Sequence, residues 1–164
     1  MIITLKNKDT LQVDDFNFKC TIGKNGTSSS KFEGDKKTPK GIFSIDKLYY
    51  RKDLIKKPIT KLKCIPIKKN MGWCHDLKRP SKYNRLIKVN KNDKHEKMYR
   101  KDYKYNLVIP IKYNFNKPKL GKGSAIFFHL SNNLKPTAGC IALRYIDFLI
   151  FLKLIDKKTK IKIT

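Results

Sequence analysis

The chain has 164 residues, of which 40% are hydrophobic, and it contains nine Phe, eight Tyr and one Trp. This length and content predict a single domain over residues 1–164 with a hydrophobic core, and they exclude an intrinsically disordered chain. The formal charge of +26 comes from 39 basic residues, of which only five are Arg. Because nucleic-acid sites tend to use Arg for bidentate and stacking contacts, Lys spread over every segment indicates biased composition, and we expect no nucleic-acid partner.

The amino terminus, Met1 to Lys6, lacks the basic start and long apolar region of a secretory signal. No stretch reaches the ~18 apolar residues of a membrane span. We therefore expect neither a signal peptide nor a transmembrane segment in this chain.

Four cysteines are present, but none forms a Cys-x-x-Cys pair, so we expect no metal and no cofactor. A zinc site built from Cys74, His75, His95 and His129 is a weaker alternative, because irregular spacings of this kind arise easily. Whether the remaining cysteines form a disulfide stays open; they are Cys20, Cys64 and Cys74.

The first half of the chain reads as strands and loops. Residues 1–22 alternate apolar and polar positions, which predicts half-buried strands and a hairpin, and the Gly- and Ser-rich stretch 23–30 predicts a flexible loop. The Thr-Pro-x-Gly turn at 38–41 leads into a strand at 42–45. Pro58 and Pro66 exclude a long helix between residues 48 and 67.

A loop bounded by Gly and Pro follows at residues 71–85, and its aromatic and amide side chains suggest a binding wall rather than a core. Residues 95–99 are highly charged and could form a short helix. Leu107 to Ile109 predicts a short strand that Pro110 confines to an edge or a strand end.

The last part of the chain predicts one helix and one strand. Residues 145–155 repeat apolar positions at helical intervals, with Ile146, Leu149, Ile150 and Leu154 expected on the buried side. Residues 159–164 alternate Lys with Ile as a terminal strand, where Lys discourages edge pairing.

The stretch 123–143 carries the strongest chemical signal. The apolar run from Ala125 to Phe128 ends in His129, and after a polar loop Gly139 and Cys140 enter a second apolar run. A thiol becomes a good nucleophile when a nearby imidazole takes its proton, and a glycine allows a substrate carbonyl to approach the amides beside the thiol. The alternative is an inert buried Cys and a core His.

This stretch resembles the catalytic core of the YkuD-type L,D-transpeptidases, enzymes that remodel peptidoglycan. The branch it is similar to has Gly-Ser-Ala-Ile-Phe before the His and Pro-Thr-x-Gly-Cys-x-Ala-Leu around the thiol, as at 123–127 and 136–143 here. The resemblance covers roughly residues 20–145 and includes upstream blocks, namely Gly34-Asp35, Thr38-Pro39, Gly41, Gly72-Trp73-Cys74, Tyr83-Asn84-Arg85, His95-Glu96 and Tyr113-Asn114.

The resemblance implies a mainly β fold, a β-sandwich with one or two short helices, and a transpeptidase with Cys140 as nucleophile. It implies that His129 moves protons and that backbone amides around Gly139 and Cys140 hold the oxyanion. It further implies substrate contacts from Trp73, Tyr83, Asn84, Arg85, His95, Glu96, Tyr113, Asn114 and Thr137.

The chain departs from the commoner members of this superfamily, which carry a second His before Gly-Cys and an Arg two residues after the thiol. Here Ala138 and Ala142 stand at those positions, so Arg85 is the candidate for the missing carboxylate contact. The partner implied by the resemblance is the peptidoglycan stem peptide, the location is the periplasm or cell wall, and we expect a monomer. The alternatives are an L,D-carboxypeptidase or other Cys peptidase of similar geometry, and a non-enzymatic basic protein that binds cell-wall polymer or nucleic acid.

Overall fold

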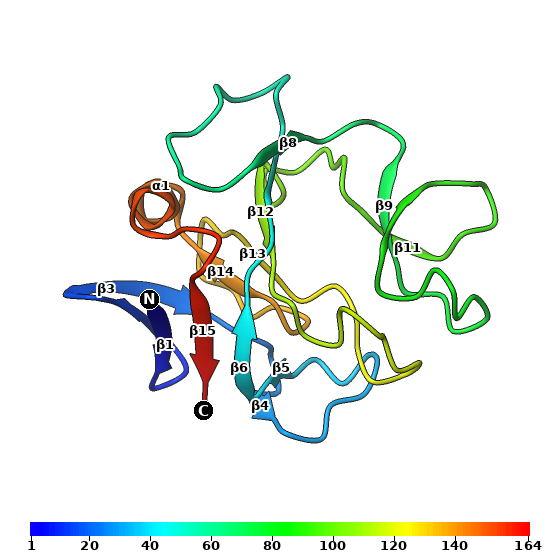
Figure 1. Cartoon of the computed structure of the whole chain (residues 1–164), viewed down its shortest axis with the longest axis horizontal. Coiled ribbons are helices and arrows are strands. Elements are labelled where there is room, and N and C mark those ends of the chain that lie inside the picture. The colour runs from blue at the N-terminus through cyan, green and yellow to red at the C-terminus, as the bar shows by residue number, and fades with distance from the viewer.

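A computed structural model describes residues 1–164, and strands dominate it (Figure 1). It contains fifteen strands and one helix, which confirms the mainly β expectation. In chain order the elements are β1 (Ile2–Lys6), β2 (Thr10–Val13), β3 (Phe16–Thr21), β4 (Thr27–Ser28), β5 (Thr38–Pro39), β6 (Gly41–Ser44), β7 (Leu48–Tyr50), β8 (Cys64–Pro66), β9 (Met71–Cys74), β10 (Leu86–Lys88), β11 (His95–Lys97), β12 (Leu107–Pro110), β13 (Phe127–Leu130), β14 (Ile141–Leu143), α1 (Tyr145–Leu154) and β15 (Lys160–Ile163).

Ten strands form one curled sheet in the order β6-β15-β1-β2-β3-β14-β13-β12-β7-β8. Beyond β6, Ile45 forms a bridge with Ile111, and the Lys112 N–H donates a 2.8 Å hydrogen bond to the Ser44 carbonyl. Since β6 pairs with β15 and β7 pairs with β12, the segment from β6 to β7 joins the two halves of the sheet. The sheet thereby curls around the main core as a β-sandwich.

The terminal strand β15 is not at a sheet edge, so that part of the sequence interpretation is wrong. It pairs in parallel with β1 and antiparallel with β6, and it therefore lies between them. Its Ile161 and Ile163 point into the core, whereas its lysines face outward. Alternation identified a strand with one buried face, but it contains no information about which strands lie on either side.

The helix α1 packs against the sheet through three buried side chains, Phe148, Phe151 and Leu152. The Phe151 ring lies 5.2 Å from that of Phe128 in β13, measured between ring centroids. The prediction that Ile146 and Ile150 face the core is wrong, because both are exposed. Nearly every position of this helix is apolar, so the periodicity does not select a face, and the aromatic side chains fill the space over the sheet. No helix in the structure is both long enough and apolar enough to span a membrane.

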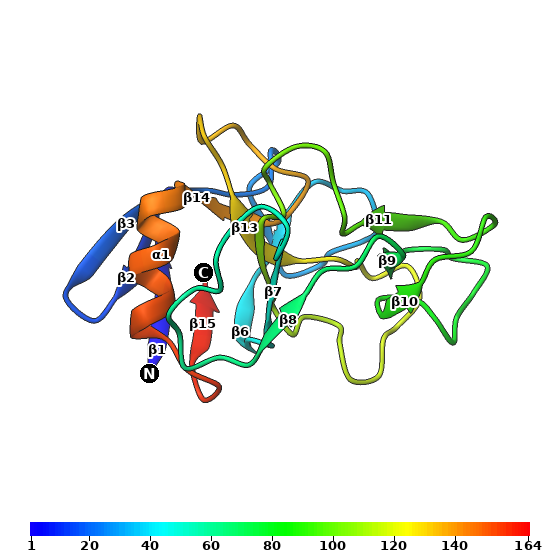
Figure 2. The ribbon, with the colours of Figure 1, turned by 90° about the horizontal axis from the view of Figure 1, so that it is seen from above.

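A second, smaller sheet has the order β10-β9-β11 and lies at the opposite end of the molecule from α1 (Figures 1 and 2). The prediction of a short helix at 95–99 is wrong, because residues His95–Lys97 form β11, which pairs with β9. A second hydrophobic cluster lies between this sheet and the outer face of the large sheet, and it includes Trp73, Met98, Phe127 and Cys140.

Candidate active site

The pairing of β13 with β14 places His129 and Cys140 on the same face of the large sheet. The two strands are parallel, and Phe128 lies opposite Ile141 while His129 lies opposite Ala142. Side chains alternate between the two faces of a strand. Phe128 and Ile141 therefore point into the main core, and His129 and Cys140 point to the outer face.

A cleft of about 560 Å³ opens on this outer face, and both His129 and Cys140 line it. It combines basic, acidic, hydroxyl and aromatic side chains from segments that are far apart in the sequence. Its other lining residues are Lys31, Glu33, Gly34, Lys36, His75, Glu96, Arg100, Tyr103, Lys104, Tyr105, Ser124, Ala125, Leu130, Ser131, Asn133, Lys135, Pro136, Thr137 and Ala138.

Cys140 rests in this cleft as a neutral thiol. Its S–H donates to the Ala125 carbonyl oxygen at 3.2 Å, and the Phe127 N–H donates to the sulfur at 3.4 Å. Burial raises the pKa of the Cys140 thiol to about 12, and the Phe127 amide opposes that shift. A base is therefore needed to remove the proton as the sulfur attacks.

His129 has one ring nitrogen engaged and the other available. Its Nδ1 lies 2.9 Å from the Leu130 carbonyl oxygen, and because a carbonyl only accepts, Nδ1 carries the hydrogen. In the neutral ring Nε2 is then the basic nitrogen. Burial lowers the pKa of His129 to about 4, so the ring is neutral at physiological pH. The Leu130 carbonyl oxygen therefore fixes the orientation of the imidazole ring.

Two threonine hydroxyls fix the backbone beside the thiol. Thr38 Oγ1 donates to the Gly139 carbonyl at 2.9 Å, and Thr137 Oγ1 donates to the Cys140 carbonyl at 2.6 Å. The Gly139 N–H is occupied, because it donates to Thr137 Oγ1 at 3.1 Å. The Cys140 N–H has no acceptor in the protein, so it is the amide of this turn that is free to receive an oxyanion.

Gly139 is required by this arrangement for two reasons. Its φ of +136° is in the region that side-chain-bearing residues rarely adopt, and a Cβ at this position would lie 2.8 Å from the Lys37 carbonyl oxygen. Any larger residue would push the loop before Thr38 away from the turn that carries Cys140.

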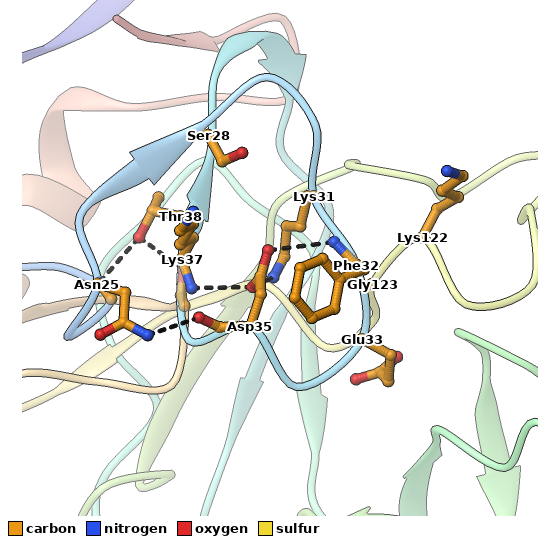
Figure 3. Close-up of polar contacts among 12 residues, drawn as sticks. Asn25, Ser28, Lys31, Phe32, Glu33, Asp35, Lys37, Thr38, Lys122 and Gly123 are labelled. Atoms are coloured by element: carbon orange, nitrogen blue, oxygen red, sulfur yellow. Dashed lines mark hydrogen bonds and ion pairs between the residues drawn. The ribbon is translucent and has the colours of Figure 1, made fainter.

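The loop that carries Thr38 is organised around Asp35 (Figure 3). The Asp35 carboxylate accepts hydrogen bonds from Lys31 Nζ at 2.6 Å, from the Lys37 N–H at 2.9 Å and from the Phe32 N–H at 3.1 Å. These contacts hold the pKa of the Asp35 carboxyl below its usual value, despite the opposing effect of burial. The ion pair of Lys31 and Asp35 is almost fully buried.

A second polar network stands beside His129. Glu96 Oε1 accepts hydrogen bonds of 2.9 Å from both Arg100 and Tyr105. The Tyr105 ring packs edge-on against the His129 ring, with 5.5 Å between centroids. Burial keeps the pKa of Tyr105 well above its usual value, so its hydroxyl remains a hydrogen-bond donor. Arg100 also forms an ion pair with Asp102, with 2.7 Å between Nη2 and Oδ2.

Three predicted substrate contacts instead support the segment before β13. Asn84 Oδ1 accepts from Trp73 Nε1 at 2.8 Å and from the Ala125 N–H at 3.0 Å. Its side-chain nitrogen donates to the carbonyls of Tyr113 and Asn114, so both polar atoms of the side chain are bonded within the protein. Tyr83, which is fully buried, accepts a hydrogen bond from the Gly123 N–H at 3.1 Å.

Of the nine predicted substrate contacts, Glu96 and Thr137 line the cleft and the others do not. Arg85 is exposed and lies outside the cleft, where the resemblance had implied a contact with a substrate carboxylate. Tyr113 and Asn114 hold the loop that leads to Gly123. Tyr113 Oη donates to the Lys122 carbonyl at 2.6 Å, and Asn114 Nδ2 donates to the Gly123 carbonyl at 2.9 Å. His95 contacts the Asp93 carbonyl at 2.7 Å. The predicted substrate-binding residues that do not line the cleft are Trp73, Tyr83, Asn84, Arg85, His95, Tyr113 and Asn114.

Sequence reasoning missed several residues of the cleft, above all Lys31, Glu33, Arg100 and Tyr105. Glu33 directly precedes Gly34 and Asp35, a block that carries the resemblance, and this neighbourhood is the one signal that could have identified it. Nothing in the local pattern separates Lys31 or Arg100 from the other basic residues.

Cys20, Cys64, Cys74 and Cys140 are all free thiols, and no group of three or more His, Cys, Asp or Glu side chains is arranged to hold a metal.

Comparison with known proteins gives one family and one solved structure. A family model described as YkuD, L,D-transpeptidase catalytic domain, matches residues 3–163. No curated protein matches the chain. A solved structure titled Structure of Bdellovibrio bacteriovorus Bd1075 is similar, with 16% sequence identity and a TM-score of 0.49. The match covers 99% of this chain and 47% of that chain, so this chain spans about half the length of the solved one.

Proposed function

The chain belongs to the YkuD family of L,D-transpeptidase catalytic domains, and from this premise we propose that it is a cysteine-dependent L,D-transpeptidase acting on peptidoglycan stem peptides. The observation that carries the proposal is the shared position of Cys140 and His129 in one cleft. The bond from His129 Nδ1 to Leu130 leaves Nε2 as the nitrogen that can take the thiol proton.

The first half of the reaction forms a thioester. Cys140 Sγ attacks the carbonyl carbon of a diamino acid in the donor stem, and its proton moves to His129 Nε2. The C–N bond to the terminal residue then breaks, and the imidazolium gives the proton to the departing amine. Because burial raises the pKa of the Cys140 thiol and lowers that of His129, it favours the neutral pair, and proton transfer would accompany attack.

The Cys140 N–H supports the proposed oxyanion position. During attack the carbonyl oxygen of the substrate gains negative charge, which a free backbone amide stabilises. Since Thr38 and Thr137 hold the turn at Gly139 and Cys140, this amide is oriented before substrate binds. No reorganisation of the loop is then needed in the transition state.

The second half of the reaction resolves the thioester. The amine nitrogen of a neighbouring stem attacks the thioester carbon and gives its proton to His129, and the sulfur leaves and regains a proton as a thiol. The product is a crosslink used in cell-wall biogenesis or remodelling. Water in place of the amine would make the protein an L,D-carboxypeptidase.

The charge of the cleft suits an anionic peptide. Five basic side chains line it against two carboxylates, Glu33 and Glu96, and a positive cleft attracts substrate carboxylates. Lys31 and Arg100 are already paired with acidic side chains, so the other three cations take the role that the sequence assigned to Arg85. The five basic residues are Lys31, Lys36, Arg100, Lys104 and Lys135. Because peptidoglycan is the proposed substrate, we expect the protein to act in the periplasm or cell wall. We also expect a monomer to be active, because one chain contains the whole cleft.

The direct test is incubation with purified tetrapeptide and pentapeptide muropeptides, followed by mass spectrometry. We expect crosslinked dimers that have lost one terminal residue, together with a transient acyl adduct on Cys140. Shortened monomers without dimers would identify a carboxypeptidase. Absence of any adduct, with no labelling of Cys140 by a carbapenem, would contradict the enzyme proposal and favour a binding protein.

A further inference from the structure

Glu33 is a carboxylate in the cleft without a basic partner. The other one, Glu96, lies 2.9 Å from Arg100. No Lys or Arg nitrogen lies within 4.0 Å of Glu33, although the chain has 39 basic residues against 13 acidic ones. In so basic a protein, an acidic group left without a cation inside a binding cleft is available to a cation from outside.

Neutral hydroxyl groups hold Glu33 in place. Its Oε2 accepts hydrogen bonds from Tyr83 Oη and, at 2.8 Å, from Ser124 Oγ. Tyr83 and Ser124 are buried, and Tyr83 is fixed in turn by the Gly123 N–H. These donors orient the carboxylate without neutralising its charge. Its second oxygen, Oε1, has no donor in the protein, and Figure 3 shows the Glu33 side chain directed away from the pair of Lys31 and Asp35.

The position of Glu33 is coupled to that of the nucleophile through consecutive residues. Ser124 binds Glu33, and the carbonyl oxygen of the next residue, Ala125, accepts the Cys140 S–H at 3.2 Å. Glu33 and Cys140 both line the same cleft. A substrate bound in this cleft can therefore meet both groups.

We propose that Glu33 is a specificity-determining residue that binds the side-chain ammonium group of the diamino acid whose carbonyl Cys140 attacks. This inference rests on the proposed function. A carboxylate oxygen without a protein donor is the natural acceptor for an ammonium group, and charge-assisted hydrogen bonds are the strong ones. The remaining cleft cations then receive the carboxylates of the same donor.

The donor amine fits this role better than the acceptor amine does. An acceptor must lose its proton to attack the thioester, and a carboxylate beside it would stabilise the protonated, unreactive form. The side-chain ammonium of the donor keeps its charge throughout the reaction. Glu33 therefore assists recognition of the donor without opposing the chemical step.

Glu33→Gln separates the charge from the structural contacts, because glutamine keeps an oxygen that can accept from Tyr83 and Ser124. The experiment uses two donor muropeptides, one with a free side-chain amine and one with that amine acetylated. The measured quantity is the rate of acyl adduct formation on Cys140, followed by mass spectrometry. Asp15→Asn, which removes an exposed carboxylate in the β2–β3 turn outside the cleft, is the control for net charge.

We expect the unsubstituted protein to acylate faster with the free-amine donor by about 10-fold to 100-fold, the range for a hydrogen bond to a charged group. Glu33→Gln should lose that preference, react with the acetylated donor as the unsubstituted protein does, and keep the same circular dichroism spectrum. Asp15→Asn should behave like the unsubstituted protein.

Three outcomes would overturn the proposal. An equal preference for the free amine in Glu33→Gln would remove Glu33 from donor recognition while leaving the transpeptidase proposal intact. An effect confined to the aminolysis step, with acylation unchanged, would assign Glu33 to the acceptor. Absence of an adduct with either donor in the unsubstituted protein would instead overturn the proposed function, and this inference with it.

Discussion

The Thr38 hydroxyl donates a 2.9 Å hydrogen bond to the carbonyl oxygen of Gly139, a residue 101 positions later in the chain. The Gly139 carbonyl and the Cys140 N–H belong to one planar trans peptide, so they point in opposite directions. Holding the carbonyl therefore aims the N–H. Thr38 in turn accepts from the Gly23 N–H at 2.9 Å, which fixes its own rotamer.

Replacing Thr38 by Val should weaken the oxyanion contact without removing the thiol or the base. We expect turnover to fall by about 10-fold or more, below the 10²–10³-fold measured when an oxyanion donor is deleted outright. Alkylation of Cys140 by a small electrophile, which needs no oxyanion contact, should change little. Thr27→Val is the matched control, since Thr27 lies beside Thr38 in the β4–β5 pair and its hydroxyl makes only a 3.5 Å contact. Equal losses in both variants would contradict the role of Thr38.

Cys140→Ala should abolish acyl transfer, because no other nucleophile is proposed. The small loss of buried volume should cost less than about 2 kcal/mol of the free energy of unfolding, so the fold is retained. Cys74→Ser is the matched control: Cys74 is fully buried and does not line the cleft. That variant should lose about 1–3 kcal/mol of stability through the buried hydroxyl yet still form the acyl adduct. Dimer formation by Cys140→Ala would disprove the mechanism.

His129→Gln should slow both Cys140 alkylation near neutral pH and turnover. Turnover should fall further, by roughly 10²–10⁴-fold, because the same imidazole also handles the leaving and incoming amines. The measurement is the alkylation rate against pH in both proteins, with folding checked by circular dichroism. An unchanged pH profile would remove His129 from the mechanism and leave Cys140 alone to support it.

The buried imidazole should also make the protein sensitive to acid. The pKa of His129 is lowered to about 4 in the folded state, against 6.5 for an unperturbed histidine. The unfolded chain therefore binds a proton first, so this contribution to stability is complete above pH 6.5 and is lost progressively between pH 6.5 and 4, by up to about 3 kcal/mol. Urea unfolding at several pH values should show a smaller acid loss in His129→Gln. An identical loss in both proteins would assign it to other groups.

Sequence patterns predicted most of the strands, the helix α1 and the positions of His129 and Cys140 at the ends of two apolar runs. Alternation identified the strands around Leu5, Leu11 and Phe18, and apolar runs that end at His129 and begin after Cys140 located β13 and β14. These are local properties, since a strand with one buried face has a period of two whatever its partners are. Because side chains alternate along each strand, the parallel pairing of β13 with β14 places His129 and Cys140 on the same face of the sheet.

The local sequence pattern could not show whether a polar loop residue binds substrate or supports the backbone of another segment. Asn84 and Tyr83 resembled binding residues because polar and aromatic side chains in a Gly- and Pro-bounded loop are typical of binding walls, yet they bond to Ala125, Ser124's neighbour, and to Gly123. A polar side chain that serves the backbone of a distant segment has no local signature. The helix face at Ile146 and Phe151 was ambiguous for a related reason, because an almost wholly apolar helix has no preferred side.

By itself, then, the sequence predicted the mainly β fold, the helix near the carboxyl terminus and the two residues, His129 and Cys140, that meet in the cleft, because each depends on residue types and spacings within one segment. Only the tertiary structure decided that β15 lies inside the sheet, that Thr38 holds Gly139 and that Glu33 and Arg100 reach the cleft rather than Arg85. Those facts depend on contacts between segments tens of residues apart. Among 39 basic residues, only the packing of the strands selects the few that line the cleft.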